Sequence, residues 1–462
     1  MTDPAAPPVQ PQGTPSGGPS RLSLALFLLA LAIALVGGAS LLLLGGSGAG
    51  SSAPSPTGSP TAATSVASGS SPAASPTAAS GSATPPASGL SDAALVAAVE
   101  AVEAQVPALR GLQPTRPVPS RVIGEVQLTA ELAQRFRDEN PHARIAAQGA
   151  LLARLGLLPA GTDLEALEEE LLGSQVIGFY DDEAKTLSIV QRGGTFGPLE
   201  RTTVAHEFTH ALQDQHFDLA KLGTDDPTNG DRASARLALA EGDATLLMGL
   251  WSLQHLSAAE QAELARQSSD PAQLALLARM PPFLVQQLLF PYQQGAAFVG
   301  RLYASGGWSA VDAVYAHPPD SSAQILHPEL YARRLEPLAV DVGAATLTAA
   351  LDAAAGTGWR ATYEDTLGEF TLGQWLTRGV GADGSAAASG WLGDRAVYLE
   401  GPAGHWYLVF KTVYDSSTSA ARFAAAAHAS LAGLAGQAAV TIGADGRTVR
   451  VTLADVPLLP GP

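Results

Sequence analysis

Two periods in the pattern of apolar and polar residues predict an α+β protein that is mainly helical. Beyond residue 92, most segments repeat their apolar residues every three or four positions, as helices with one buried face do. We therefore expect helices over residues 93–106, 129–136, 147–155, 163–172, 199–217 and 232–254, and more of them up to about residue 334.

Segments with the pattern of strands are fewer and shorter. Residues 175–180 and 186–191 are rich in β-branched and aromatic residues and flank a polar turn, so they predict a β-hairpin directly before the helix at 199–217. Strands and helices mix after residue 359, which predicts a small C-terminal α+β module. Its expected helices lie at 371–377 and 419–434, and its expected strands at 396–400, 406–414, 439–442 and 448–453.

A long uncharged segment occupies residues 22–44. As a helix it would span about 34 Å, enough to cross the hydrocarbon core of a bilayer. The apolar part of a cleaved signal peptide is usually shorter, about 7–15 residues, so the length favours a transmembrane anchor. Small residues at 45–50 keep cleavage, and hence a secreted protein, as the alternative.

Charge and composition indicate how the chain is organised around this anchor. Arg21 precedes the apolar segment and the next charge is Asp92, so the positive-inside rule places the tail in the cytoplasm and the rest outside the cell membrane. The segment before the main domain is nearly all Ser, Ala, Pro, Thr and Gly, which predicts a flexible linker. We expect a disordered tail at 1–21, a single transmembrane helix at 22–44, the linker at 45–90, a main domain at 91–358 and the module at 359–462.

The composition excludes several kinds of partner and site. The net charge is −17 and the pI is near 4.9, which argues against nucleic acid as a partner because phosphate binding needs a basic surface. The chain has no cysteine, so disulfides, cysteine-ligated zinc, iron–sulfur clusters and a cysteine nucleophile are excluded. Any metal must be held by His, Asp or Glu.

The helix predicted at 199–217 carries a His-Glu-Phe-Thr-His sequence at residues 206–210. Side chains four positions apart on a helix are offset by about 40° around its axis and about 6 Å along it, so both imidazoles can reach one metal ion. Glu207 lies beside them, where it can hold a zinc-bound water and take its proton as the water attacks a carbonyl group. The motif predicts a zinc hydrolase with His206 and His210 as ligands and Glu207 as the general base.

A third protein ligand is expected on the next helix. Glu241 falls within an apolar stripe of the helix predicted at 232–254, where a carboxylate is costly unless it is paired or binds a metal. The neighbouring Gly242 costs about 1 kcal/mol relative to Ala in a helix interior, and close approach of two helices would explain it. We expect Glu241 to be the third zinc ligand, with a buried Arg as its alternative partner.

Two residues near the end of the motif helix have alternative interpretations. His216 has the spacing of the third ligand in the His-Glu-x-x-His-x-x-Gly-x-x-His pattern, but Gln213 occupies the position of the Gly at which the chain would turn. On a straight helix His206 and His216 lie about 15 Å apart, too far to share an ion. Asp214 is either a hydrogen-bond partner of a ligand His or a solvated surface charge.

The motif, the Ala-Leu-Gln-Asp-Gln-His-Phe-Asp-Leu that follows it, and Glu-Gly-Asp-Ala at 241–244 resemble a bacterial gluzincin peptidase over about residues 170–330. The resemblance implies a zincin-like catalytic domain that binds Zn2+ and acts on a peptide or protein substrate. It also implies that Glu241 is the third ligand and that the strand at 186–191 is the edge that pairs with an extended substrate.

The resemblance leaves two features of the site open. An Asp is common four residues after the Glu ligand, but this chain has Thr245 there and its nearest acid is Asp243. A downstream His or Tyr often stabilises the oxyanion in this clan, and the candidates are Tyr292 and His327.

The function expected from these observations is that of a membrane-anchored, zinc-dependent peptidase with an extracytoplasmic catalytic domain. Two alternatives come from other classes of protein. One is a surface-displayed binding protein that keeps the metal site without catalysis, and the other is a zinc amidase that acts on cell-wall material.

Overall fold

The computed structural model describes residues 92–175, 178–190, 196–269 and 271–459. The predicted tail, transmembrane segment and linker lie outside these residues, so the membrane anchor stays a prediction. Within the described part of the chain, no helix combines the length and the apolar character needed to cross a membrane.

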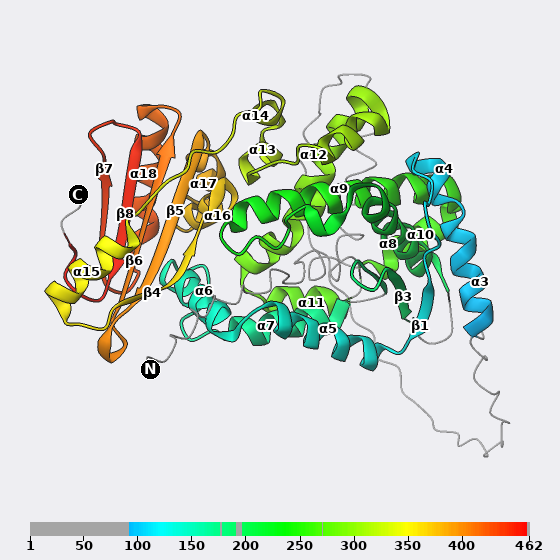
Figure 1. Ribbon diagram of the computed structural model, residues 1–462, viewed down its shortest axis with the longest axis horizontal. Coiled ribbons are helices and arrows are strands. Elements are labelled where there is room, and N and C mark those ends of the chain that lie inside the picture. Colours follow the sequence, from blue (N-terminus) through cyan, green and yellow to red (C-terminus); the bar gives the residue numbers. More distant parts are fainter. Residues whose placement is uncertain (1–91, 176–177, 191–195, 270, 460–462) are drawn as a thin grey trace, which may run out of the picture.

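The protein is α+β and mainly helical, as the sequence pattern predicted, and its described residues form two sheets (Figure 1). The smaller sheet consists of β1 (Ser120–Ile123), β2 (Gly178–Asp181) and β3 (Thr186–Val190). The helices before the hairpin are α3 (Asp92–Glu103), α4 (Val106–Arg110), α5 (Glu125–Glu139), α6 (His142–Arg154) and α7 (Leu164–Gln175). The elements after the hairpin are α8 (Pro198–Phe217), η2 (Leu219–Lys221), α9 (Gly230–His255), α10 (Ala258–Gln267), α11 (Pro271–Arg279), α12 (Pro282–Tyr315), α13 (Ser322–Leu326) and α14 (Pro328–Ala332).

The order of strands in the smaller sheet corrects one expectation. The β2–β3 hairpin is present, but the order is β1-β3-β2, with β1 parallel and β2 antiparallel to β3. The strand predicted at 186–191 to be the substrate-pairing edge is therefore the central strand, and β1 and β2 form the edges. The cause is β1, a four-residue strand far away in sequence that the sequence pattern did not reveal.

The C-terminal part of the chain forms a five-stranded antiparallel sheet with helices on both faces. Its strands have the order β4-β5-β6-β8-β7, and every neighbouring pair is antiparallel. The strands are β4 (Arg360–Asp365), β5 (Trp391–Glu400), β6 (Trp406–Tyr414), β7 (Gln437–Ile442) and β8 (Thr448–Ala454), and β4 was not predicted. The helices are α15 (Ala344–Ala355), α16 (Gly368–Val380), η3 (Gly381–Asp383), α17 (Gly384–Ala388), η4 (Pro402–Gly404) and α18 (Ser417–Leu431).

Alternate residues of the central strands pack on opposite sides of this sheet. Leu408 and Phe410 of β6 face a core that includes Trp375 of α16 and extends to Leu151 of α6. Tyr407 and Val409, together with α15, belong to a separate core on the other face. The sheet therefore shares one hydrophobic core with the helical part of the molecule. The predicted domain boundary at residue 359 stays a prediction, and α15, which precedes it, packs on the sheet.

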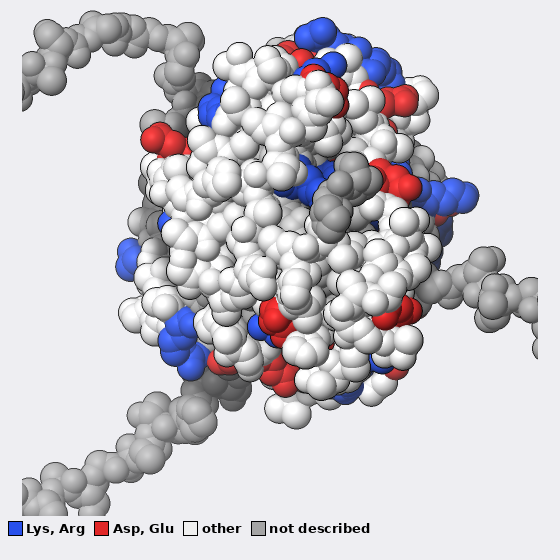
Figure 2. All heavy atoms as spheres, turned by 90° about the vertical axis from the view of Figure 1, so that its left-hand side faces the viewer, with Lys and Arg blue, Asp and Glu red and all other residues white. Residues whose placement is uncertain are grey.

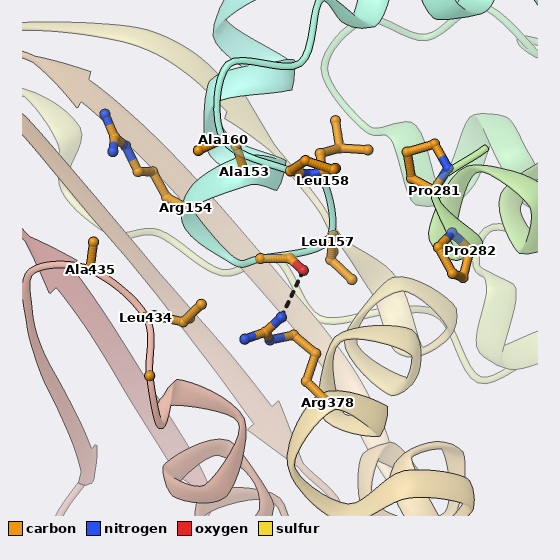
Figure 3. Close-up of a pocket in the computed structure, with 13 residues that line it drawn as sticks. Ala153, Arg154, Leu157, Leu158, Ala160, Pro281, Pro282, Arg378, Leu434 and Ala435 are labelled. Atoms are coloured by element: carbon orange, nitrogen blue, oxygen red, sulfur yellow. Dashed lines mark hydrogen bonds between the residues drawn. The ribbon is translucent and has the colours of Figure 1, made fainter. Parts of the chain in front are cut away.

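The sheet lies at one end of the molecule, and uncharged side chains cover most of that end (Figures 1 and 2). A cavity of about 470 Å³ lies where α6, the start of α12, α16 and the segment after α18 meet (Figure 3). Arg378 donates a hydrogen bond to the Gly156 carbonyl 3.0 Å away, and the Arg154 guanidinium stacks 4.3 Å from the centre of the Trp406 ring. Both arginines on the cavity wall thus connect the helical part to the C-terminal module.

Helices α9 and α12 approach closely at two glycines. A Cβ atom added to Gly242 would lie 2.3 Å from the Gly295 carbonyl carbon, and one added to Gly295 would lie 2.1 Å from the Ala238 carbonyl oxygen. The contact explains why a glycine is tolerated beside Glu241, in the middle of a 26-residue helix. Close approach was predicted, and α12 is the helix that makes it.

Gly295→Ala should lower the melting temperature, because the new methyl group would overlap a backbone carbonyl and force α9 and α12 apart at a cost of about 1–3 kcal/mol. Gly300→Ala is the matched control. The added atom meets nothing within 4 Å on the same helix, so this change should be neutral or stabilising by up to about 1 kcal/mol. Calorimetry of both variants tests the contact, and equal melting temperatures would contradict it.

Four acidic side chains are buried where the N-terminus of α9 meets the C-terminal module: Asp231, Asp365, Glu369 and Asp394. Main-chain N–H groups offset part of their charge. Asp365 accepts from Gly230 at 2.6 Å, Asp394 accepts from Leu367 and Gly368 at 2.8 Å each, and Asp231 accepts from Ser322 at 3.1 Å. These contacts attach the start of α9 to the end of β4 and to α13, and the start of α16 to β5.

Burial, together with the neighbouring Asp394 and Glu369 carboxylates, raises the pKa of Asp231 to about 8. Between pH 4 and pH 8 the folded state therefore holds a proton that the unfolded state has released, so this group makes stability fall as the pH rises. Asp231→Asn keeps an acceptor for Ser322 and should reduce the loss of melting temperature over that range. Asp383→Asn, at an exposed site, is the control and should reproduce the wild-type dependence of melting temperature on pH. A wild-type dependence in Asp231→Asn would show that Asp231 is ionised in the folded state and would contradict the prediction.

Candidate metal centre

Helix α8 places two imidazole rings on the same face, one turn apart. It begins after Gly197, whose N–H donates to Glu200 at 2.8 Å, and Pro198 occupies its first turn. Residues from Thr202 to Asp214 are buried on all sides of the helix. The Nε2 atoms of His206 and His210 lie 3.0 Å apart, so both rings point to one position.

Helix α9 brings a carboxylate to the same position. Glu241 Oε2 lies 3.2 Å from His206 Nε2 and 3.6 Å from His210 Nε2, and none of the three side chains is exposed to solvent. One ligand atom from each residue lies within 4.8 Å of the other two. The structure thus brings together the three residues predicted as zinc ligands, and the alternative that Glu241 pairs with an Arg is wrong.

The donor set fits a metal ion. Two imidazole nitrogens and a carboxylate oxygen converge, which is a ligand combination that Zn2+ accepts, with a position left for a fourth ligand. Glu207 Oε1 and Glu241 Oε1 are buried and have no hydrogen-bond partner among the described residues. Such atoms are costly in a protein interior, so their clustering favours a site that holds a cation and its own small ligand.

The pKa values of His206 and Glu241 also indicate that the group needs a cation. Burial lowers the pKa of His206 to about 4. Burial would raise the pKa of Glu241, but the His210 and His206 rings outweigh it and lower this pKa to about 2. The Glu241 carboxylate is therefore ionised in a fully buried site and needs a cation beside it, which is either a proton on His210 or a metal ion.

Glu207 lies beside the ligand group with one oxygen held and one free. Its Oε2 accepts a hydrogen bond from the Tyr180 N–H at 2.9 Å, on the outer edge of β2, and its Oε1 is the unpartnered atom described above. Burial raises the pKa of Glu207 to about 8. The role of Tyr180 could not be predicted from the sequence, because the contact uses only its main chain.

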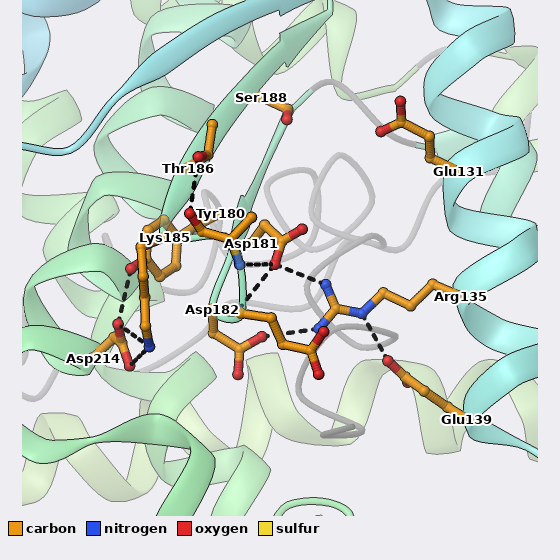
Figure 4. Close-up of polar contacts among 12 residues, drawn as sticks. Glu131, Arg135, Glu139, Tyr180, Asp181, Asp182, Lys185, Thr186, Ser188 and Asp214 are labelled. Atoms are coloured by element: carbon orange, nitrogen blue, oxygen red, sulfur yellow. Dashed lines mark hydrogen bonds and ion pairs between the residues drawn. The ribbon is translucent and has the colours of Figure 1, made fainter. Parts of the chain in front are cut away.

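Asp214 has neither of its predicted roles. It is buried, with 5% of its surface exposed, and it accepts from the Tyr180 hydroxyl at 2.9 Å rather than from a ligand His. Lys185 and Arg116 also bind it, at 2.7 Å and 3.0 Å. Figure 4 shows Tyr180 and Lys185 pointing to Asp214 from the hairpin. Asp214 therefore acts on the site indirectly, through the strand that holds Glu207.

The far side of the same hairpin is held by α5. Arg135 lies 3.0 Å from Asp181 and 3.1 Å from Asp182, and it also binds Glu139 on its own helix at 2.7 Å (Figure 4). The hairpin is thus fixed both to α8, which carries the motif, and to α5. This arrangement fixes the position of the Tyr180 N–H relative to Glu207.

Gln213 is a buried residue of the site whose contacts the sequence did not predict. Its Oε1 atom lies 2.8 Å from His210 Nδ1, and its Nε2 atom donates to the Ala240 carbonyl of α9 at 3.0 Å. The side chain occupies the position of the turn-forming Gly in the alternative motif, but here the helix continues to Phe217. A buried polar residue one turn after a ligand His was the available signal.

Asp243, two residues after Glu241, does not contact the ligand histidines. It forms a two-bond pair with the fully buried Arg110 of α4, both bonds 2.8 Å long, and it accepts from the Tyr315 hydroxyl at 2.8 Å. Arg110 also binds Asp312 at 2.7 Å and stacks on Trp308. This charged network fixes α9 to α4 and α12 close to Glu241.

The two oxyanion candidates differ in position. The Tyr292 ring of α12 is buried, with its centroid 6.4 Å from that of His206, so it lies beside the metal centre. His327 binds Glu369 at 2.7 Å, and Glu369 belongs to the buried acidic cluster at the start of α9. That cluster contains Asp231, ten residues or about 15 Å before Glu241 on the same helix, so the structure places His327 with the cluster, and its oxyanion role stays a prediction.

The alternative third ligand, His216, is also excluded. Its ring is exposed, and its Nε2 atom lies 2.7 Å from the Gln113 carbonyl oxygen, with α8 continuing straight between it and the motif. The Gly-turn pattern therefore does not apply to this chain.

Comparison with known proteins identifies only the C-terminal part. A domain family of unknown function, DUF8575, matches residues 339–457, which include α15 and the five-stranded sheet but not the metal centre. No curated protein and no solved structure shows a significant match to the chain.

Metal analysis tests the ligand set directly. The full-length wild type should bind one zinc ion, and Glu241→Ala should weaken binding by more than the roughly 10–100-fold that loss of a ligand's hydrogen-bond partner costs. His216→Ala is the control and should bind zinc as the wild type does. Full zinc affinity in Glu241→Ala would remove Glu241 from the site.

Proposed function

We propose that the protein is a zinc-dependent peptidase, anchored in the cell membrane by residues 22–44, with its catalytic domain on the extracytoplasmic side. One observation supports the hydrolase above all. Two imidazoles and a carboxylate from α8 and α9 converge beside Glu207, and one oxygen of Glu207 has no partner among the described residues.

His206, His210 and Glu241 would hold the zinc ion. Bound there, zinc would supply Lewis-acid chemistry that makes a water molecule nucleophilic near neutral pH. Glu207 is placed to accept the proton of that water on Oε1, while the Tyr180 N–H holds Oε2 and fixes the direction of the carboxylate. Tyr292, whose ring lies beside that of His206, would stabilise negative charge on the substrate carbonyl oxygen.

The number of protein ligands distinguishes this proposal from a structural metal site. A structural zinc site is closed by four protein ligands, whereas the described residues provide three and an adjacent acid. The complete burial of the group favours the alternative of a non-catalytic metal site, because a substrate cannot reach it without movement of the surrounding chain. Activity measurements on zinc-loaded protein decide between the two.

Glu207→Gln should keep zinc binding and lose hydrolysis. The amide oxygen still accepts from Tyr180 but cannot take a proton, so the rate should fall by about 100-fold or more. Zinc content and cleavage of casein would be measured on full-length protein, with Glu100→Gln on the exposed face of α3 as the control.

Three results would overturn parts of this proposal. Wild-type rates in Glu207→Gln would exclude Glu207 as the base. Zinc-loaded wild type that does not cleave casein but degrades purified cell wall would support the cell-wall amidase instead. Zinc-loaded wild type that cleaves neither would be a binding protein with a structural metal.

A further inference from the structure

We infer that Gln213 is a positioning residue of the metal centre, which fixes the tautomer of His210 and the register of α9 through one amide group. The inference rests on the proposed zinc site and adds a residue that the His-Glu-x-x-His motif does not contain. It depends on two hydrogen bonds made by a side chain with no exposed surface.

The orientation of the amide follows from its two partners. The Ala240 carbonyl oxygen can only accept a hydrogen bond, so the Gln213 NH2 group must face it. The amide oxygen then faces His210 at 2.8 Å, and because this oxygen can only accept, His210 must carry a proton on Nδ1.

The proton on Nδ1 determines what the other nitrogen can do. In the neutral ring, Nε2 keeps its lone pair and points it to the position shared with His206 Nε2 and Glu241 Oε2. A metal ligand needs this tautomer, and the Gln213 contact selects it over the tautomer that carries the proton on Nε2. His206 has no such partner on Nδ1 among the described residues. Gln213 therefore orients only the His210 ring.

The second bond acts on the other ligand helix. Ala240 directly precedes Glu241, so the bond from Gln213 fixes the α9 backbone at the ligand itself. A slip of one residue along α9 would rotate Glu241 by about 100° and move its carboxylate away from both rings. One side chain on α8 therefore orients a ligand of its own helix and the backbone beside a ligand of the neighbouring helix.

An amide suits this position better than a carboxylate. A carboxylate would accept from His210 but would place a second oxygen against the Ala240 carbonyl, with no proton between them. It would also add a negative charge to a fully buried site that already holds Glu207 and Glu241. The neutral amide makes both bonds without either cost.

The test compares zinc affinity in two variants of the full-length chain. Gln213→Met has similar length and makes neither bond, so zinc binding should weaken by about 10–100-fold in a chelator competition, and the absorption spectrum of the cobalt-substituted protein should change. Gln213→Glu restores the bond to His210 alone and should bind zinc more tightly than Gln213→Met. Gln215→Met, two residues later, loses surface hydrogen bonds to Thr115 and Arg116 and should match the wild type.

A merely structural role would lower the melting temperature of both Gln213 variants without separating their zinc affinities, and that result would overturn the inference. So would wild-type affinity and an unchanged cobalt spectrum in Gln213→Met. If Gln213→Met does not fold, nitrogen-15 NMR of histidine-labelled, zinc-loaded wild type decides. A protonated Nδ1 and a metal-bound Nε2 are expected for His210, and metal on Nδ1 overturns the inference. Wild type that binds no zinc would instead refute the proposed function.

Discussion

The contact between α8 and α9 places two imidazoles and a carboxylate in a fully buried space, and the surrounding structure is arranged around that contact. Removing an ionised carboxylate from water costs several kcal/mol, which hydrophobic packing alone does not return. Glu241 is ionised there because the His210 and His206 rings outweigh the effect of burial on its pKa. A cation is therefore required between the two helices, and the geometry allows either a proton or a metal ion to provide it.

Helix α9 is held along its length by three different kinds of contact. Its N-terminus binds the acidic cluster of the C-terminal module, its middle lies against α12 at Gly242 and Gly295, and Asp243 binds Arg110 of α4. At the two glycines the backbones of α9 and α12 touch, so the helices cannot slide past each other. The pair of Arg110 and Asp243 cannot be broken without leaving a buried charge. Together they leave Glu241 little freedom to move relative to α8. The C-terminal module shares a hydrophobic core with the main domain and binds the start of α9. It is therefore part of the framework that positions α9, the helix that carries Glu241.

The sequence predicted the parts of the site that depend on spacing within one helix. Two local patterns carried this prediction. His206 and His210 are one helical turn apart, and Glu241 lies on an otherwise apolar stripe. The structure brings the three residues together. The strands β1 and β4 were missed because they are short or charged, and β1 changed which strands form the edges of the small sheet. The polar, Pro-bounded segment around His327 could not be placed from the sequence, since such a segment is typical of both a cleft and a domain junction.

The contacts that the sequence could not predict join residues far apart in the chain through atoms that carry no residue-specific signal. Tyr180 holds Glu207 with its main-chain N–H, and Gln213 binds the main-chain carbonyl of Ala240. Any residue could supply these backbone atoms, so only the folded arrangement of the hairpin, α8 and α9 reveals them.

The first helices of the described chain also support the two helices that carry His206, His210 and Glu241. Helices α3 and α4 directly follow the predicted linker and pack on α8 and α9, the two helices that carry His206, His210 and Glu241. Arg110, the last residue of α4, supplies the charge that Asp243 needs beside the metal centre. The segment that leads from the predicted linker into the domain thus supports the candidate metal centre, because without it a carboxylate near Glu241 would be buried with no guanidinium to balance it.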